Sequence, residues 1–366
     1  MKPRVTVGVI GCGYWGPNLL RNLRKVPNCH LKAMCDISEK RLLHMKSLYA
    51  DVEAMTDYQH MLNGIGIDAV VIAAPVKYHY SLAKEALLSG KHALIEKPMA
   101  SSSAECAELV EIAERNGLVL MVGHTFLYSS AVRRITEIVR AGDLGDLRYI
   151  NARRLNLGLF QKDINVAWDL APHDISIILN ILGEFPLVVN CQGNAHITPN
   201  IEDVTNMSLT FRNNRFATIQ SSWLEPRKVR EMTIVGTRRM IVYDDLQTSE
   251  KIRIYDVRVE RPPHYDSFAE FQYSYHYGDS YIPHLQQEES LKVECQHFID
   301  CIENGSKPLT DGRDGHDLVR ILEASSESLK RNGAPVTFSK STELPLTTQP
   351  LRSKTGPVPI SIPLSS

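Results

Sequence analysis

The sequence predicts an α/β domain with a parallel sheet, followed by an α+β domain with an open-faced, mostly antiparallel sheet. Two observations lead to this fold class. In residues 1–123, short apolar segments alternate with helical patterns, as in parallel strands joined by crossover helices. From about residue 124, segments of alternating polarity follow one another closely, as in antiparallel strands.

The first domain, residues 1–123, is expected to contain five buried strands separated by helices. Each candidate strand is a short apolar run of the length that strands usually have. Helical periodicity falls between the runs, for example over residues 81–89 and 104–116. The expected strands are 5–10, 31–35, 69–73, 93–95 and 119–122.

The second domain, residues 124–339, is expected to combine helices with a sheet that has one face uncovered. Helices are predicted over 130–141 and 170–182, and again near 288–304 and 313–331. Residues 261–287 are rich in Tyr, His and Pro, and we interpret them as a long loop. Residues 340–366 are rich in Pro, Ser and Thr and predict an extended tail. The expected strands are 148–155, 205–211, 216–222, 231–235 and 251–256.

The composition is that of an ordinary globular protein. The 366 residues are 43% hydrophobic and 23% charged, and the formal net charge of -1 gives no general attraction for nucleic acid or an anionic membrane. No apolar run approaches the roughly 18 residues of a membrane helix, and the N-terminus has no signal-peptide layout. The seven cysteines are scattered without metal-ligand spacing, so we expect no metal, reduced thiols and a cytoplasmic protein.

A glycine cluster after the first strand predicts a Rossmann dinucleotide-binding turn. Gly11, Gly13 and Gly16 have the spacing G-x-G-x-x-G between a strand and a helix. The first glycine permits the tight turn, the second lets the backbone approach a pyrophosphate, and the third lets helix and strand pack closely. The amides at the helix N-terminus would then face the phosphates.

Three more residues near this turn bear on the cofactor. Asp36 ends the second strand, where a carboxylate can bind both ribose hydroxyls and repel a 2′-phosphate, which favours NAD over NADP. Trp15 either packs under the helix or walls the phosphate pocket together with Tyr14. We favour packing for Trp15 and a pocket role for Tyr14.

The tripeptide Glu96-Lys97-Pro98 lies at the carboxyl end of a strand, where doubly wound sheets bind ligands. Lys97 could there place a positive charge beside a reacting oxygen, although an exposed lysine in a turn has the same pattern. Ala74 and His79 follow another strand, near the expected position of the nicotinamide.

Asp169 and His173 are four residues apart at the start of the 170–182 helix, whose apolar positions recur at 175, 178, 179 and 182. His173 points away from this stripe, and Asp169 shares its direction if the helix reaches back that far. Pro172 suits the first turn and Gly183 the C-terminal end. A carboxylate beside a histidine can set its tautomer; the alternative is a surface pair near a helix start.

These three motifs, in this order, resemble the glucose–fructose oxidoreductase/inositol dehydrogenase (Gfo/Idh/MocA) family over about residues 4 to 338. The resemblance implies a Rossmann domain that binds NAD, a sheet domain that mediates a homo-dimer or homo-tetramer, and an active site between the domains. It places Lys97, Asp169 and His173 at the catalytic positions. The implied cofactor contacts are Gly11, Gly13, Tyr14, Trp15, Gly16, Asp36, Ala74, His79, Glu96 and Lys97.

The segments "GCGYWGPNLLRN" and "WDLAPHDISII" are similar to the branch of the family that oxidises C3 of UDP-linked N-acetylhexosamines or their uronates. This likeness implies a nucleotide-sugar substrate, with contacts from Arg153, Arg154, Asn156 and His124, and with Arg227 as a further candidate for the pyrophosphate. His173 would be the general base, Lys97 would polarise the ketone oxygen and Asp169 would orient His173, while Lys97 and His173 could exchange roles. The alternatives are a dehydrogenase of free sugars, inositols or dTDP-keto sugars, and a non-catalytic NAD-binding regulator.

Overall fold

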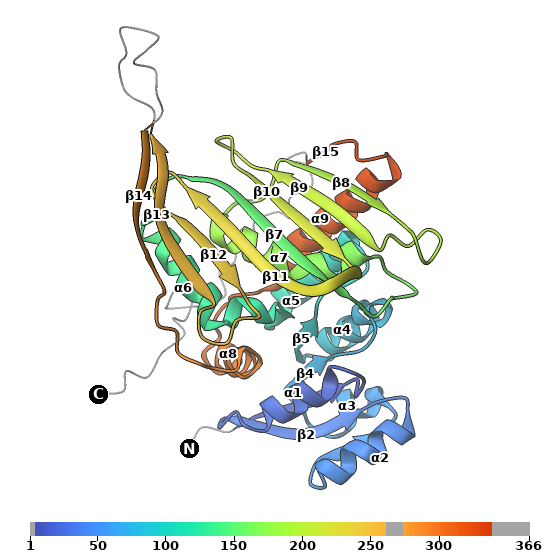
Figure 1. The fold of residues 1–366 in the computed structure, drawn as a ribbon. Coiled ribbons are helices and arrows are strands. Elements are labelled where there is room, and N and C mark those ends of the chain that lie inside the picture. The colour runs from blue at the N-terminus through green and yellow to red at the C-terminus, as the bar shows by residue number, and fades with distance from the viewer. Residues whose placement is uncertain (1–3, 261–273, 339–366) are drawn as a thin grey trace, which may run out of the picture. The chain divides into compact units, whose positions relative to one another are not determined.

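The computed structural model describes residues 4–260 and 274–338, and the chain divides into two compact units (Figure 1). The first unit includes residues 4–128 and 288–323, and the second includes 129–260, 274–287 and 324–338. We expected residues 124–339 to form one continuous second domain, so the position of 288–323 is a correction. Its physical reason is that helix α8 (Ser290–Asn304) packs against α1 (Gly16–Leu23) of the first unit. The expected tail over 340–366 lies outside the described residues.

The first unit contains a parallel sheet of six described strands in the order β3-β2-β1-β4-β5-β6. All five expected strands are present, within two residues of their expected bounds. The sixth, β3, is a three-residue edge strand without an apolar run, which explains why periodicity did not predict it. The strands are β1 (Val5–Ile10), β2 (Cys29–Cys35), β3 (Glu53–Met55), β4 (Ala69–Ile72), β5 (His92–Glu96) and β6 (Leu120–Gly123).

Helices connect these strands and carry clear start and stop signals. In α5 (Ser103–Asn116), Ser102 accepts a hydrogen bond from the Glu105 N–H and Gly117 ends the helix with a φ of 64°. The remaining helices of this unit are α2 (Glu39–Leu48), α3 (Tyr58–Gly64), α4 (His79–Leu88) and the short 3₁₀ segments η1 (Val76–Tyr78) and η2 (Thr125–Tyr128). Each of the seven cysteines is free and buried.

The second unit contains a sheet of nine described strands in the order β14-β13-β12-β11-β7-β10-β9-β8-β15. Neighbours pair antiparallel except β7 and β10, which pair in parallel. The expected loop over 261–287 is wrong for residues 274–281, which form β14 along β13; residues 261–273 lie outside the described chain. The strands are β7 (Leu147–Leu157), β8 (Val188–Asn194), β9 (Val204–Thr210), β10 (Phe216–Ser222), β11 (Leu224–Gly236), β12 (Met240–Asp244), β13 (Ile252–Glu260), β14 (Ser274–Tyr281) and β15 (Val336–Thr337).

One face of this sheet is covered by helices, as Figure 1 shows. The helices are α6 (Ser130–Arg140), α7 (Val166–Leu182) and the C-terminal part of α9 (Gly312–Lys330). The covered face of β7 and β10 carries buried residues such as Ile150, Ala152 and Ile219. The opposite face carries the stacked pair Tyr149 and Phe216. The two faces explain why burial alternates along much of the central strands β7 and β10.

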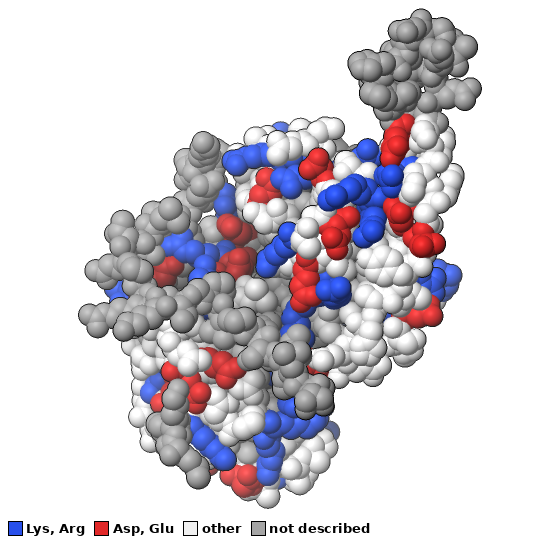
Figure 2. Space-filling model, turned by 90° about the vertical axis from the view of Figure 1, so that its left-hand side faces the viewer, with Lys and Arg blue, Asp and Glu red and all other residues white. Residues whose placement is uncertain are grey.

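The face of the molecule drawn in Figure 2 has no large region of a single charge. Figure 2 shows Lys and Arg interspersed with Asp and Glu over much of this face, in agreement with the small formal net charge of the sequence. Within residues 4–260 and 274–338, no helix has both the length and the apolar character that a membrane span requires.

Candidate active site

The glycine turn of the first unit has the geometry that its spacing predicts. Gly11 has a φ of 101°, and a Cβ there would lie 2.5 Å from the Ala73 carbonyl oxygen. A Cβ on Gly16 would lie 2.0 Å from the Gly11 carbonyl oxygen. Next to Gly13, by contrast, the nearest atom is an Arg41 nitrogen at 3.6 Å. Gly11 and Gly16 therefore permit close packing, and Gly13 leaves room beside the backbone for a ligand.

Asp36 lies directly after β2 and is tied to this turn. One carboxylate oxygen accepts the Cys12 N–H at 2.7 Å, and the other accepts the Ser38 N–H at 2.8 Å. The Arg41 guanidinium lies 3.9 Å from the same carboxylate. Asp36 thus braces the glycine turn, a contact that the sequence analysis missed, and a carboxylate retains further acceptor sites for a ribose.

The two aromatic residues of the turn have different environments. Tyr14 is 88% exposed, so it packs against little of the protein, and its expected role at the phosphate pocket stays a prediction. Trp15 is the N-cap residue of α1 and forms a hydrogen bond with the Glu96 side chain. The expectation that Trp15 packs beneath the helix is therefore incomplete, because its indole also links the glycine turn to the end of β5.

Lys97 follows β5, and its charge acts on the side chains of His79, Glu96 and His124. His79 is buried, and its ring nitrogens lie 2.7 Å from the Ala74 oxygen and 2.8 Å from the Pro98 oxygen. Both nitrogens therefore face backbone oxygens, and the one that carries the proton donates to its partner, which favours a bracing role for His79 over the expected cofactor contact. Burial raises the pKa of Glu96 to about 7, against the opposing charge of Lys97.

His124 follows β6 and is 2% exposed, and neither ring nitrogen has a hydrogen-bond partner among the described residues. Burial, aided by the Lys97 charge, lowers the pKa of His124 to about 3, so the ring is neutral. Buried polar atoms without partners are uncommon in native proteins and often mark a functional site.

In the second unit, α7 carries both Asp169 and His173. The helix begins at Val166, with the Asn165 side chain capping the Trp168 N–H. The helix therefore reaches back far enough to include Asp169, as the alignment of Asp169 with His173 requires. Because of this earlier start, Pro172 lies inside the helix, and its expected place in the first turn is wrong. Gly183 ends the helix with a φ of 65°, as expected.

Trp223 holds Asp169 and was not found by sequence analysis. Its indole N–H donates a 3.1 Å hydrogen bond to Asp169 Oδ2, although the two residues are 54 positions apart. Trp223 is buried and packs beside Phe160 and Gly158. The predicted substrate contact Asn156 also lies at Gly158, because its amide nitrogen is 3.1 Å from the position of a Cβ there. A lone tryptophan at a strand end carries no spacing signal.

The two arginines expected at the substrate have opposite environments because they alternate along β7. Arg154 is buried and forms a bidentate ion pair with Asp174 of α7, at 2.8 and 2.9 Å. Its assignment as a substrate contact is therefore corrected to a structural role. Arg153 lies on the helix-free face, 3.6 Å from Glu231. Arg227, in an irregular part of β11, is exposed.

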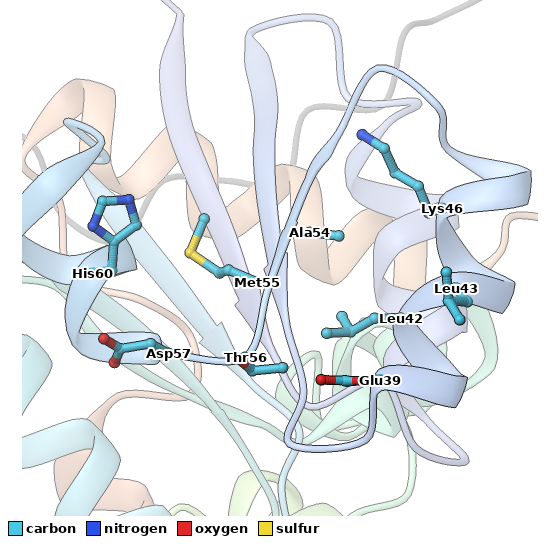
Figure 3. Close-up of a pocket in the computed structure, with 9 residues that line it drawn as sticks. All are labelled: Glu39, Leu42, Leu43, Lys46, Ala54, Met55, Thr56, Asp57 and His60. Atoms are coloured by element: carbon cyan, nitrogen blue, oxygen red, sulfur yellow. The ribbon is translucent and has the colours of Figure 1, made fainter.

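A groove of about 580 Å³ lies elsewhere in the first unit, between α2 and the start of α3 beside β3. Figure 3 shows side chains of α2 on one side and those of β3 and α3 on the other. None of the predicted site residues lines it, although the carbonyl oxygen of the lining residue Met55 accepts a 3.3 Å hydrogen bond from the Asp36 N–H. The lining residues are Glu39, Leu42, Leu43, Lys46, Ala54, Met55, Thr56, Asp57 and His60.

A dinucleotide fits the residues of the first unit. Gly13 leaves space, the N-terminus of α1 presents backbone N–H groups, and Asp36 is fixed at the end of β2. With Lys97 at the end of β5, these features define a class, the dinucleotide-dependent oxidoreductases. Two family models match the chain: an oxidoreductase family with an NAD-binding Rossmann fold over residues 5–124, and a Gfo/Idh/MocA C-terminal domain over residues 132–242. The chain belongs to the Gfo/Idh/MocA family, and its cofactor is NAD.

Curated relatives of different activity resemble the chain over most of its length. An uncharacterized oxidoreductase, YrbE of Bacillus subtilis, is 26% identical over 92% of this chain and 98% of its own length. A UDP-N-acetylglucosamine 3-dehydrogenase of Acidithiobacillus ferrooxidans is 27% identical over 71% of this chain and 77% of its own. The solved structure of the latter protein has a TM-score of 0.76 at 23% identity and covers 90% of this chain and 99% of its own, which supports the fold.

Proposed function

We propose that this oxidoreductase oxidises the C3 hydroxyl of a UDP-N-acetylhexosamine, with a hydroxymethyl or a carboxylate at C6, to the 3-keto sugar. The observation that carries the proposal is the joint presence of Lys97 at the end of β5 and of Asp169 and His173 on α7 in a chain with the dinucleotide turn. The resemblance of the turn and of α7 to the C3-oxidising branch, and the relative named above, support the nucleotide-sugar substrate.

In this proposal the chain's residues move and stabilise charge around the reacting carbon. NAD, when bound, accepts a hydride at C4 of its nicotinamide. His173 takes the hydroxyl proton, and Lys97 stabilises the negative charge that develops on the oxygen. Asp169 orients His173 from the preceding helical turn, and the indole of Trp223 holds Asp169 in turn. The 3-keto product would suit an enzyme that adds an amino group at C3.

The chain is proposed to assemble as a homo-dimer or homo-tetramer through the helix-free face of the nine-stranded sheet. Tyr149 and Phe216 are stacked there with centroids 5.5 Å apart, and they are 37% and 44% exposed. A sheet face with exposed aromatic side chains is covered most simply by a symmetric second copy. Sedimentation would test this, and a stable monomer at micromolar concentration would contradict it.

The substrate is tested by incubation with NAD and a panel of candidates, followed by mass spectrometry. The panel contains UDP-N-acetylhexosamines and their uronates, dTDP sugars, free sugars and inositols. A keto product from a UDP-N-acetylhexosamine supports the proposal. A product from a free sugar, an inositol or a dTDP sugar would replace it with the alternative dehydrogenase. NAD binding without turnover of any member would favour a regulator.

A further inference from the structure

Two carboxyl groups of the first unit contact one short segment, residues 123–125. Glu96 is paired with Gly123 in the ladder of β5 and β6, and its carboxylate atoms lie 3.2 Å from the position of a Cβ on Gly123. Glu294, on α8, accepts a 2.8 Å hydrogen bond from the Thr125 hydroxyl. The end of β6 therefore brings Glu294 close to the Glu96 carboxylate, next to Lys97.

More hydrogen-bond donors surround the carboxyl of Glu96 than that of Glu294. Glu96 accepts hydrogen bonds from the Trp15 side chain and the Lys97 backbone N–H, and the Lys97 charge acts on it. Glu294 is 0% exposed, and its Oε1 has no partner among the described residues. A carboxylate is stable where donors and cations surround it, whereas a buried carboxyl with one donor favours the protonated form.

The electrostatics of the pair lead to the same assignment. Burial and the charge of Glu96 raise the pKa of Glu294 well above its usual value. The other titratable groups nearby add little charge at neutral pH: His124 is neutral, and burial raises the pKa of Tyr128 and of Cys295 well above their usual values. A negative charge at Glu294 would raise the pKa of both of these groups, so they belong to the same electrostatic cluster.

We propose that Glu294 is a positioning residue for Lys97: its carboxyl stays protonated in the native protein and confines the negative charge of the pair to Glu96, beside the lysine. No distance between Glu294 and a substrate is implied, because Glu294 acts through Glu96. Loss of the proton would add a second negative charge near Lys97 and weaken the attraction of the ammonium for a developing oxyanion. This catalytic consequence rests on the proposed function, whereas the proton assignment does not.

The proton is tested without any sugar by infrared spectroscopy of the full chain at about pH 8, above the pKa of about 7 of Glu96, so that Glu96 is mostly ionised. Glu294→Gln keeps the size of the side chain and removes the acid, so the carbonyl stretch of one protonated carboxyl should disappear. Glu303→Gln, on the same helix, is the matched control and should leave that band in place. Thr125→Val removes the donor to Glu294, so in this variant the band should persist to higher pH than in the wild type.

The positioning role is tested by the pH dependence of kcat/KM with the sugar found in the panel. The ratio of Glu294→Gln to wild type should rise by about threefold or more with increasing pH, because the wild type gains a charge that the amide cannot acquire. A ratio that is the same at every pH would overturn the positioning role. An infrared spectrum unchanged by Glu294→Gln, with Thr125→Val also silent, would overturn the proton assignment, whatever the substrate proves to be.

Discussion

The glycine turn of the first unit and helix α7 of the second carry the candidate chemistry in different ways. The turn is built from residues within six positions of one another, and Asp36 joins it by accepting a hydrogen bond from the Cys12 N–H. On α7, Asp169 is held by Trp223 from 54 positions away, and Asp174 by Arg154 from 20 positions away. The sequence signal for the turn is a local spacing, although Ala73 and Asp36 also pack against it. On α7, by contrast, no local spacing indicates the distant partners of Asp169 and Asp174.

This difference predicts which substitutions act locally and which act through the fold. In the turn, a change at a ligand-facing position should alter NAD binding with little effect on stability. On α7 and its neighbours, a change can act on stability or on turnover, and the contact partners decide which. Adjacent residues of β7 provide the sharpest test, because Arg153 and Arg154 face opposite sides of the sheet.

The largest expected effect is that of Arg154→Gln on stability. The substitution leaves the buried Asp174 carboxylate without its cation, which typically costs about 3–5 kcal/mol in the free energy of unfolding. Arg153→Gln is the matched control, since its exposed pair with Glu231 should contribute about 1 kcal/mol or less. Denaturant unfolding measures both. Equal, small losses would restore Arg154 as a candidate substrate contact.

The catalytic substitutions should follow, with losses of turnover of about 10²-fold or more. His173→Asn removes the proton acceptor, and Lys97→Met removes the positive charge at the reacting oxygen. Because both residues serve one reaction, the loss in the double variant should be less than the product of the single losses. Single-turnover formation of NADH at 340 nm gives the rates, and thermal melts show whether each variant is folded. Near-normal rates in folded variants would contradict the catalytic assignment.

Local patterns predicted the first unit better than the second. The spacing of Gly11, Gly13 and Gly16 predicted the turn, and the structure leaves no room for a Cβ on Gly11, against Ala73, or on Gly16, against Gly11. The position of Arg154 could not be settled in this way, because its partner Asp174 lies on a helix packed against the other strands. Trp223 carried no pattern at all, and its role depends on a tertiary contact.

For the fold as well, local patterns predicted the strands with a clear polarity pattern and missed features that depend on tertiary contacts. Apolar runs located β1 and β4, and alternating polarity located β10. β14 was missed because its residues are almost all exposed and leave no alternation to detect. The placement of α8 with the first unit also could not be read from its own sequence. An amphipathic pattern shows that a helix has a partner, and only the tertiary fold shows that the partner is α1.

A smaller effect is expected in the turn, where Asp36 should make NAD bind at least about tenfold more tightly than NADP, a difference near 1.4 kcal/mol. Asp36→Ala removes the charge that repels a 2′-phosphate and should narrow this gap. The same change removes the acceptor for the Cys12 N–H, so some loss of affinity for both cofactors is expected as well. Calorimetry with both cofactors measures the ratio, and equal affinities in the wild type would remove the basis for the assignment.

The smallest expected effect is a difference in turnover between variants of two tryptophans, Trp223, which contacts α7, and Trp168, which lies on α7. Trp223→Phe deletes the hydrogen bond to Asp169. It should lower turnover only by several-fold, because the bond acts on the proposed base indirectly, through Asp169, so that only part of the about 1.5–3 kcal/mol typical of a hydrogen bond to a charged group affects the rate. Trp168→Phe is the matched control, because its indole donates a 2.8 Å hydrogen bond to the Ser326 hydroxyl instead. Each substitution removes the same volume of side chain and one hydrogen bond, so the melting temperatures of the two variants should fall by similar amounts. If turnover falls equally in both, the contact between Trp223 and Asp169 is structural; a loss confined to Trp223→Phe would show that long-range packing positions the proposed base.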